Sequence, residues 1–404
     1  MSVTVIGIGD DGIDGLSTRA RTCLANAALI VGSPRHLNML PAHDTRERRL
    51  WSKDLSADIE AFAPRTQSEH VVVLASGDPL MYGIGNRLLS HFGTENVLML
   101  PSPSAFSLAA ARMGWPLSDP MLSCVSVHGL PLQTLALHIQ PSVKLLILSR
   151  DKESPAEIAK LLCTVGFGDS PMSILECMNG DHEKRTNTVA KDGVDSDFQN
   201  LNTVAVECIA NADFQPLSRS PGLPDSAFEH DGTITKREVR AITLAALAPL
   251  PGDVLWDIGA GNGTIAIEWL RVEPRAHALA FEKDPARAGR ITANAAALGV
   301  PDLQVVAEHF PLVYDGVEPV PDAIFIGGGL ASSDTLIEKC LKILEPGGRI
   351  VANAVTLQAQ AQLMTAHAAH GGELVRIAIA RADAVGPLQA MKSSIDVLQW
   401  RVTI

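Results

Sequence analysis

The sequence predicts an α/β protein built from two domains of different fold, and three observations support this. The 404 residues are too many for one ordinary hydrophobic core. Short apolar runs rich in β-branched residues alternate with helical segments along almost the whole chain. Each half also has its own glycine-rich turn, at residues 71–85 and 255–270, and the two turns differ in kind. Simple duplication of one domain is therefore not expected.

The composition is that of a folded globular protein, with 46% hydrophobic and 19% charged residues. The net charge of -12 argues against a nucleic-acid partner, which would favour a basic face. We expect no membrane span, because no run of about 18 apolar residues occurs. The start shows no signal-peptide pattern, and the six cysteines form no close pair. We therefore expect a cytoplasmic protein without a metal site.

In the first half, eight apolar runs are expected to be strands: VTVIGIG, ALIVG, HVVVLAS, NVLML, CVSVHG, KLLILS, MSILEC and TVAVECIA. Local signals place the helices between them. Serine caps are expected at Ser17, Ser33 and Ser104, and helices should end at Gly93 and Gly114. Strands that alternate with helices in this way imply an α/β architecture.

The segment SGDPLMYGIG, residues 76–85, is the most specific part of the first half. Asp78 and Pro79 form a tight turn at a strand end, and Gly83 follows. Such a turn can serve a ligand, but a structural role alone also explains Asp78, because Asp-Pro is common turn chemistry. The candidate ligand-binding residues around it are Gly7, Gly9, Asp78, Pro79, Gly83 and Ser104.

Two further features of the first half carry ionisable side chains. His128, in SVHG, is either a substrate-facing group or an ordinary histidine at a strand end. Arg35 and His36 follow the second expected strand, and we expect both to face solvent.

The boundary between the domains lies in a stretch rich in proline, serine and glycine that starts at residue 211. No periodic apolar pattern crosses it. The expected organisation is a first domain over 1–210, a linker over 211–229 and a second domain over 230–404.

In the second half, seven further runs are expected to be strands: VLWDIGAG, AHALAFEK, LQVVAEH, AIFIGGG, GRIVANAV, ELVRIAIA and SIDVLQWRVTI. Asp284 before Pro285 should begin a helix that Gly299 ends. The last two runs have no helix between them, which predicts an antiparallel pair at the end of the sheet.

The turn after the first of these strands is D-I-G-A-G-N-G. Glycines are needed where a strand turns sharply into a helix and a ligand approaches the backbone. About 19 residues further on, Glu282 ends the next strand and can accept both ribose hydroxyls of an adenosine. Taken alone, this pattern suits NAD as well as S-adenosylmethionine. The candidate cofactor residues are Asp257, Gly259, Ala260, Gly261, Asn262, Gly263 and Glu282.

Two details favour S-adenosylmethionine over a dinucleotide. The loop lacks the GxGxxG spacing, and Asp257 suits a ligand that carries an ammonium rather than a pyrophosphate. The antiparallel end is also unusual for a dinucleotide domain. Residues 230–404 therefore resemble the class I S-adenosylmethionine-dependent methyltransferases, with a Rossmann-like fold. A structural alternative is that Asp257 only caps the following helix.

The segment DGTITKREVR, residues 231–240, resembles the decarboxylating methyltransferases of cobalamin synthesis. Locally, Thr235 and Glu238 read as a capping box for a helix that starts at Lys236. The resemblance implies that Thr235 also contacts the cofactor. Because the third strand of this domain ends in AEHF, His309 and Phe310 are expected to serve the adenine where relatives commonly have Gly-Asp.

The first half, residues 1–210, resembles the tetrapyrrole methylases, a two-lobed fold with S-adenosylmethionine in the cleft. Ser76 departs from the more usual glycine of its GGDP motif, and the opening loop GDDGIDGLS lacks the usual proline. The fusion of both halves resembles the precorrin-6Y C5,15-methyltransferase family. That resemblance implies methylation of C5 by the first domain, and methylation of C15 with loss of the C12 acetate carboxyl by the second.

A tetrapyrrole substrate carries many carboxylates, so basic side chains should line its cleft. The candidates are Lys236, Arg237 and Arg240, each of which could equally belong to a solvated helix face. The resemblance also implies a homo-oligomer. Other readings stay open: a nicotinamide oxidoreductase that uses the Gly259 turn, a methyltransferase for another substrate such as a protein, and a first half that only docks or hands over substrate.

Overall fold

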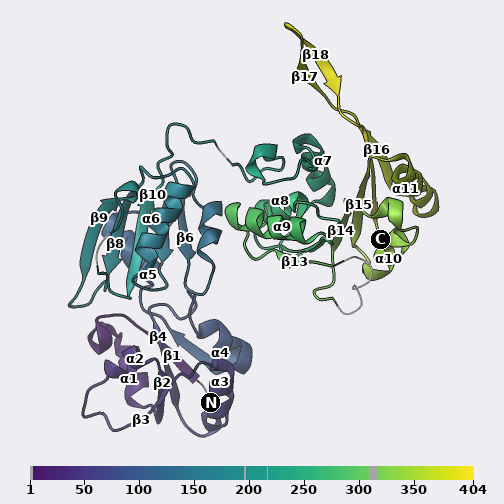
Figure 1. Cartoon of the computed structure of the whole chain (residues 1–404). Coiled ribbons are helices and arrows are strands. Elements are labelled where there is room, and N and C mark those ends of the chain that lie inside the picture. The colour runs from purple at the N-terminus through teal and green to yellow at the C-terminus, as the bar shows by residue number, and fades with distance from the viewer. Residues whose placement is uncertain (1–2, 195–196, 216, 309–316) are drawn as a thin grey trace. The chain divides into compact units, whose positions relative to one another are not determined.

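The computed structural model describes residues 3–194, 197–215, 217–308 and 317–404. The chain forms two compact units (Figure 1). The first unit comprises Met1–Leu132 and His138–Phe214, and the second comprises Gln133–Leu137 and Gln215–Ile404.

The first sheet of the first unit is wholly parallel, with strand order β3-β2-β4-β1-β5. Its strands are β1 (Val3–Ile8), β2 (Leu29–Gly32), β3 (Glu47–Leu50), β4 (Val71–Ser76) and β5 (Val97–Leu100). Its helices are α1 (Thr18–Ala25), α2 (Pro34–Asn38), α3 (Leu55–Phe62) and α4 (Gly85–Phe92). The strands β1, β2 and β4 are almost entirely buried valine, isoleucine and leucine, as expected for a parallel sheet with both faces covered.

The second sheet of this unit is mixed, with order β6-β7-β10-β8-β9. Only β6 and β7 pair in parallel, and the other neighbours are antiparallel. Its strands are β6 (Leu122–Ser126), β7 (Lys144–Leu148), β8 (Pro171–Glu176), β9 (Lys184–Val189) and β10 (Asn202–Glu207). The helices α5 (Ala105–Met113) and α6 (Ser154–Thr164) belong to this part.

The second unit has a seven-stranded sheet of order β13-β12-β11-β14-β15-β19-β16. Its strands are β11 (Val254–Ile258), β12 (His277–Phe281), β13 (Gln304–Val306), β14 (Ala323–Ile326), β15 (Arg349–Ala354), β16 (Glu373–Ile377) and β19 (Val397–Thr403). The strand β19 runs antiparallel between β15 and β16. The predicted α/β class and the antiparallel end of the sheet are confirmed.

Helices cover both faces of this sheet. One buried cluster holds side chains of α7 (Arg237–Leu247), α8 (Thr264–Val272) and α9 (Pro285–Ala297). The other holds side chains of α10 (Leu336–Ile343) and α11 (Leu357–His370). The order of the strands reverses between β11 and β14, and ligands of open α/β sheets bind at the carboxyl ends of strands at such a point.

A two-stranded ribbon projects from the second unit between β16 and β19 (Figure 1). It consists of β17 (Ala380–Val385) and β18 (Leu388–Ser393), and every residue of both strands is exposed. We call it the arm. The sequence analysis missed it, together with the short strands β3 and β9.

Most of the predicted helix ends are confirmed. Ser17, Ser33 and Ser104 cap their helices through side-chain oxygens, and Asp284 caps α9. The capping box at Thr235 is wrong, because α7 starts at Arg237 with no side-chain hydrogen bond at its cap. Among the described residues, no helix combines the length and the apolar character that crossing a membrane requires.

Candidate functional site

Three loops of the first unit meet where the carboxyl ends of β1, β4 and β5 lie side by side. The Gly77 amide donates to the Ile8 carbonyl at 3.1 Å, and the Ser102 amide donates to the Gly77 carbonyl at 3.1 Å. The Ser102 hydroxyl donates to the Gly7 carbonyl at 2.7 Å. A methyl group on Gly7 would lie 1.8 Å from the Gly77 oxygen, so only glycine lets these loops meet.

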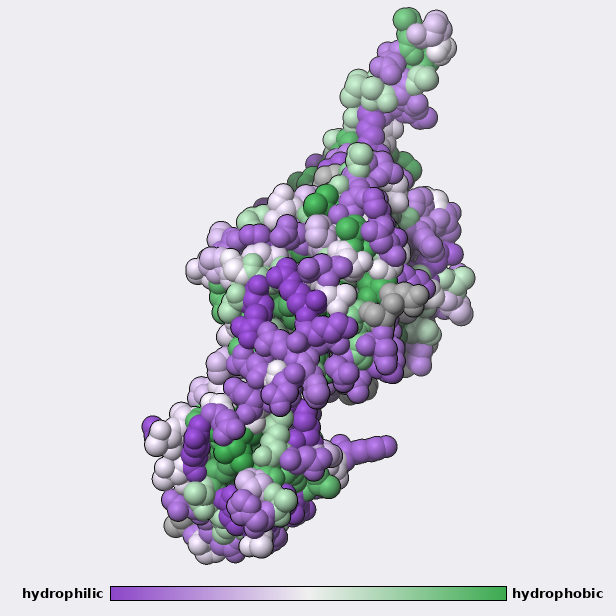
Figure 2. Space-filling view, turned by 90° about the vertical axis from the view of Figure 1, so that its left-hand side faces the viewer, coloured by the Kyte–Doolittle hydropathy of each residue, from purple (hydrophilic) through white to green (hydrophobic). Residues whose placement is uncertain are grey.

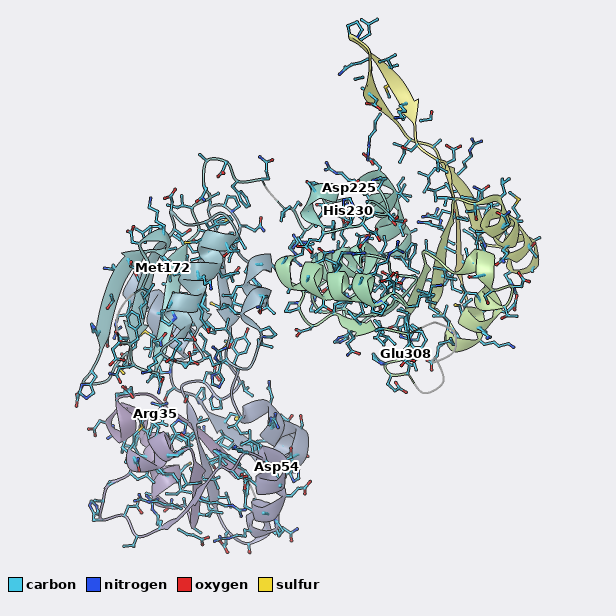
Figure 3. The ribbon with its side chains drawn as sticks, viewed as in Figure 1. Arg35, Asp54, Met172, Asp225, His230 and Glu308 are labelled. Carbon is cyan, nitrogen blue, oxygen red and sulfur yellow. The ribbon has the colours of Figure 1, made fainter. Side chains whose placement is uncertain are left out.

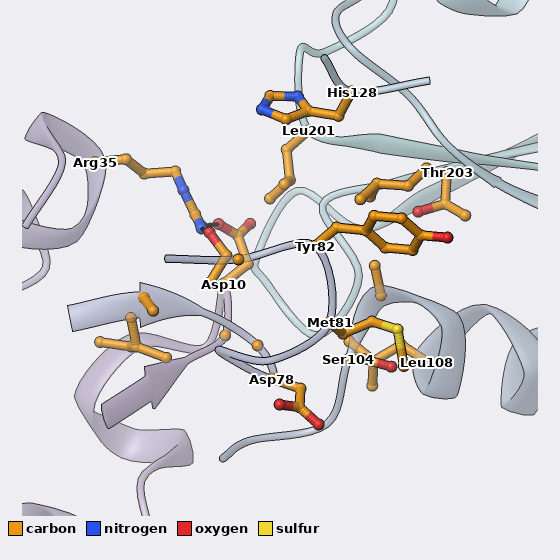
Figure 4. A pocket seen from close by; sticks show the side chains of 18 of the residues that line it. Asp10, Arg35, Asp78, Met81, Tyr82, Ser104, Leu108, His128, Leu201 and Thr203 are labelled. Carbon is orange, nitrogen blue, oxygen red and sulfur yellow. Dashed lines mark hydrogen bonds and ion pairs between the residues drawn. The ribbon is translucent and has the colours of Figure 1, made fainter. Parts of the chain in front are cut away.

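Beside these loops lies a cavity of about 630 Å³. The wall contains five of the sequence-predicted residues, Gly9, Asp78, Gly83, Ser104 and His128. Asp78 comes from the loop after β4 and Ser104 from the loop after β5, and His128 lies on the opposite side of the cavity (Figure 4). Gly7 and Pro79 shape the loops behind it. The structure therefore gathers most of the predicted first-half residues at one place.

The Asp78 turn is stabilised largely by its own chain. One carboxylate oxygen of Asp78 accepts a hydrogen bond from the Leu80 amide at 2.9 Å. The Pro79 carbonyl accepts from the Gly85 amide at 2.9 Å, and a methyl group on Gly83 would lie 2.6 Å from the same carbonyl. The structural interpretation of Asp78 thus accounts for one of its two oxygens. The Ser104 hydroxyl accepts from the Ser107 amide at 3.1 Å and so starts α5.

The same wall holds a polar cluster that the sequence did not reveal, formed by Asp10, Arg35, His36 and Ser76. The guanidinium of Arg35 lies 3.2 Å from an Asp10 carboxylate oxygen and 2.9 Å from the Ser76 hydroxyl. His36 is only 6% exposed, so the expectation that it faces solvent is wrong. Burial, together with the charge of Arg35, lowers the pKa of His36 to about 4. The segment GSPRHL directly after the second strand was the signal that could have found this cluster.

In the second unit, two glycine loops lie against each other at the reversal point of the sheet. Gly259 follows β11 with a φ of +69°, and a methyl group on it would lie 2.9 Å from Gly328, which follows β14. Gly263 begins α8 with a φ of +78°, and a methyl group there would lie 2.7 Å from Ile291. Gly261 has a φ of +61° and open space where a side chain would be. The middle of the turn is therefore accessible to a ligand.

Asp257, the penultimate residue of β11, is 1% exposed. One of its carboxylate oxygens accepts from the Ala266 amide of α8 at 3.2 Å. The other, Oδ1, is buried and has no hydrogen-bond partner among the described residues. Burial raises the pKa of Asp257 to about 7; the hydrogen bond from Ala266 opposes the shift, and the charge of Glu282 adds to it. Capping of α8 thus explains one oxygen of this carboxylate, and the other oxygen, Oδ1, is left for a cationic partner.

Glu282 and Asn262 flank the turn in different ways. The Glu282 carboxylate accepts from the Gly261 amide at 2.8 Å and from the Asp284 amide at 2.9 Å, which places it beside the open part of the turn. The Asn262 side chain donates to the Thr233 carbonyl at 2.8 Å and accepts from Arg290 at 2.9 Å. It therefore tethers neighbouring chain segments. Ala260 donates its amide to the Phe281 carbonyl at 3.1 Å.

The segment before α7 is fastened to α9. Asp231 lies 2.8 Å from the Arg287 guanidinium and 3.0 Å from that of Arg290. The Thr233 amide and Arg287 are the main causes that lower the pKa of Asp231 to about 2. This segment carries Thr235, whose carbonyl accepts from Arg240.

Arg240 does not face a substrate cleft, and this expectation is wrong. Its side chain is fully buried and lies 2.8 Å from Glu268 and 2.8 Å from Asp225, which is labelled in Figure 3. The guanidinium also stacks on the Phe228 ring, 5.0 Å from its centroid. Glu268 also accepts from the amides of Gly222 and Leu223 at 2.6 and 3.1 Å. The pair therefore fixes the chain around Gly222 and Leu223 within the second unit.

The remaining basic candidates lie at the start of α7. Lys236 is 3.5 Å from Asp225 with a half-exposed side chain, and Arg237 is exposed. Phe310 and His309, expected near an adenine, lie outside the described residues. In the part of the chain that the structure describes, no group of three or more histidine, cysteine or acidic side chains could hold a metal ion.

Known proteins resemble both units. Residues 2–192 match the family model of tetrapyrrole (corrin/porphyrin) methylases, and residues 226–404 match that of a precorrin methyltransferase domain. The chain is 43% identical to the decarboxylating precorrin-6Y C(5,15)-methyltransferase of Sinorhizobium sp., over 99% of this chain and 96% of the relative.

Two shorter relatives are each named for one of the two methylations. The cobalt-precorrin-7 C(5)-methyltransferase of Salmonella typhimurium is 34% identical, over 50% of this chain and 98% of its own. The probable cobalt-precorrin-6B C(15)-methyltransferase (decarboxylating) of Pyrobaculum aerophilum is 36% identical, over 34% of this chain and 72% of its own.

Proposed function

The chain belongs to the family of decarboxylating precorrin-6Y C(5,15)-methyltransferases, and from this we propose how its two units divide the work. It is an enzyme of cobalamin biosynthesis that uses S-adenosylmethionine as methyl donor. We assign methylation of C5 to the first unit, and methylation of C15 with decarboxylation of the C12 acetate to the second. The observation that carries this assignment is the pair of separate glycine-loop sites, one in each unit.

The residues of the second unit fit S-adenosylmethionine. Its ammonium suits the unpartnered Oδ1 of Asp257, and its ribose hydroxyls suit the Glu282 carboxylate. The open space at Gly261 leaves room for a ligand against the backbone. In the first unit, we assign the cofactor to the loops that carry Gly9, Asp78 and Ser104.

When bound, S-adenosylmethionine supplies an electrophilic methyl group on a sulfonium. The residues of the chain hold the cofactor and the macrocycle in line and exclude water, and such positioning accounts for much of a methyl-transfer rate. The attacking carbon belongs to the electron-rich macrocycle, so no nucleophilic side chain is needed. In decarboxylation, the bond between the acetate CH₂ and its carboxylate breaks and carbon dioxide leaves. The conjugated ring holds the electron pair until a proton is added at the CH₂, which becomes a methyl group.

Cofactor stoichiometry tests the division of work. Equilibrium dialysis of S-adenosylmethionine against the full chain should give two sites. Asp257→Ala should lose one site and with it C15 methylation, and Asp78→Ala should lose the other site and with it C5 methylation. A single site in the wild type would mean that one glycine turn is only structural.

We also assign the protein to the cytoplasm, without a nucleic-acid partner, and to a homo-oligomer. The arm supports self-association, because an isolated two-stranded ribbon is only marginally stable in water. Its exposed apolar side chains, among them Val385, Leu388 and Met391 at 60–73% exposure, would be covered by a second copy (Figure 2).

A further inference from the structure

The cavity of the first unit presents a fixed cation in a largely apolar wall. Its lining includes aromatic and aliphatic side chains such as Tyr82, Phe106 and Leu108, which suit the faces of a flat macrocycle. Arg35 reaches into this cavity from α2 toward Asp10 (Figure 4). Its side chain is 32% exposed, so part of the guanidinium is open to a ligand.

The neighbours of Arg35 hold its guanidinium in one orientation. Nη1 donates to Asp10 at 3.2 Å, and Nη2 donates to the Ser76 hydroxyl at 2.9 Å and lies 3.2 Å from Nε2 of His36. Nε2 of His36 also lies 3.0 Å from the Ser76 hydroxyl. The lowered pKa of His36 keeps this imidazole neutral, so it can accept hydrogen bonds and adds no repulsion. A guanidinium fixed in this way loses little freedom when it binds an anion.

Two other arginines line the cavity but are less suited to this role. Arg150 lies 2.9 Å from both Asp151 and Glu157, so its charge is already balanced. Arg87 lies exposed on α4, so its long side chain is free to adopt several orientations. Arg35 is thus the oriented cation of the cavity, with a single carboxylate beside it.

We propose that Arg35 binds a peripheral carboxylate of the tetrapyrrole in the first unit and that Asp10 and Ser76 position Arg35 for it. The fixed guanidinium sets the rotation of the macrocycle in its plane, and with it the bridge carbon that faces the methyl donor. Arg35 is therefore a specificity-determining residue for C5. This inference rests on the proposed function, which supplies both the polycarboxylate substrate and the C5 reaction.

The main rival is a purely structural clip, in which the Arg35–Asp10 pair only joins α2 to the loop after β1. The two interpretations differ in what each substitution does. A clip loses its function when either partner is removed. A carboxylate anchor loses its function when Arg35 is removed but largely keeps it in Asp10→Asn, because the amide oxygen can still accept from Nη1 and hold the guanidinium in place.

The test measures both reactions of the full chain with precorrin-6Y and methyl-labelled S-adenosylmethionine, so that each new methyl group is identified by its chemical shift. The variants are Arg35→Ala, Arg35→Lys and Asp10→Asn, with Arg19→Ala, an exposed arginine of α1, as the matched control. Thermal unfolding and the dissociation constant of S-adenosylmethionine are measured for each variant.

Arg35→Ala should raise the KM of C5 methylation about 10- to 100-fold, the loss expected for one charge-assisted hydrogen-bond pair. Arg35→Lys should recover part of that loss, and Asp10→Asn should change this KM by less than about threefold. C15 methylation and decarboxylation, performed by the second unit of the same molecules, should keep their KM. Cofactor binding should be unchanged.

Equal rises in KM and equal falls in unfolding temperature in Arg35→Ala and Asp10→Asn would establish the clip and overturn the assignment. An unchanged KM in Arg35→Ala would also overturn the assignment. If the wild type leaves C5 unmethylated, the proposed function is wrong and this assignment fails with it. If the wild type methylates C5, only the role of Arg35 is in question.

Discussion

Burial of the Asp257 carboxylate makes this side chain selective for a cationic ligand. The backbone satisfies one oxygen, and the other lies buried without a partner among the described residues. Leaving a buried acceptor unsatisfied costs about 1–3 kcal/mol, which a cationic ligand can offset. The sequence predicted this site because a strand, a GxGxG turn and a helix follow each other directly. It could not predict that burial would raise the pKa of Asp257 to about 7.

We expect S-adenosylmethionine to bind the second unit more weakly as the pH falls through 7. The raised pKa of Asp257, about 7, means that the free protein carries a neutral acid below that pH, whereas the ammonium of the cofactor needs the carboxylate. The dissociation constant should therefore be about tenfold larger at about pH 6 than at about pH 8. Calorimetric titration of the Asp78→Ala variant, which isolates the second site, checks this.

Asp257→Asn provides the control for that titration, because it keeps the shape and removes the charge. It should bind weakly across the whole range and show no pH dependence. A wild-type dissociation constant that stays constant between the two pH values would contradict the role of Asp257.

Arg240 differs from Asp257 because its ion-pair partners are Glu268 and Asp225 of the protein itself, so its role is stability rather than ligand binding. Arg240→Ala should lower the free energy of unfolding of the second unit by about 3–5 kcal/mol, because Glu268 would stay buried without its cation. Urea unfolding followed by tryptophan fluorescence measures this, and Arg237→Ala, one turn earlier and exposed, should change stability by less than about 0.5 kcal/mol. A stable Arg240→Ala with weakened substrate binding would restore the original expectation.

At the scale of elements, local chemistry predicted more than long-range pairing did. Ser17, Ser33 and Asp284 start their helices as expected, because a cap depends on neighbours within three residues. The capping box at Thr235 failed because the segment before α7 is instead held through Asp231 and Asn262, residues that pair with α9. Such tertiary hydrogen bonds leave no trace in local sequence.

The arm escaped prediction for a related reason. Its strands alternate small, charged and apolar residues without a buried face, so no period-2 pattern marks them. The clearest signal was the Gly386-Pro387 pair, which is typical of a turn. An element with no buried face cannot be recognised from core patterning.

Replacing residues 380–393 by a short glycine-serine link should leave a folded chain that no longer self-associates. The arm contributes no side chain to the buried clusters, so the sheet should keep its stability. Sedimentation velocity compares this variant with wild type and with Gln389→Ala, a mild change on the same arm. A wild-type chain that sediments as a monomer, or a deletion that still oligomerises, would contradict the proposed role of the arm.

At the scale of the whole molecule, the sequence predicted the class of both units because each repeats strand and helix in regular order. It could not give the arrangement of strands, since pairing partners such as β11 and β14 are separated by about 65 residues. The polar cluster around Arg35 was missed for the same reason: Asp10 and Ser76 come from other strands. A site that is assembled from several loops can be predicted only when the order of the strands in the sheet is known.

Mixing two inactive variants should restore the full reaction if the units act independently. Asp78→Ala alone should stop before C5 methylation and Asp257→Ala before C15 methylation, whereas the mixture should make the fully methylated, decarboxylated product through the free intermediate. Mass spectrometry of the products checks this, with each variant alone as control. A mixture that stalls like its components would mean that the substrate must pass between units of one molecule.

The position of β19 has a consequence for synthesis on the ribosome. This strand fills the gap between β15 and β16, although it follows every other strand of the sheet in the chain. Until residues 397–403 emerge, the edges of β15 and β16 are unpaired, and such edges can form hydrogen bonds with strands of other chains. The first unit can complete both of its sheets long before that. Newly made chains should therefore carry a finished first unit and a protease-sensitive second one, and a stop codon just before β19 should yield a chain that is rapidly degraded.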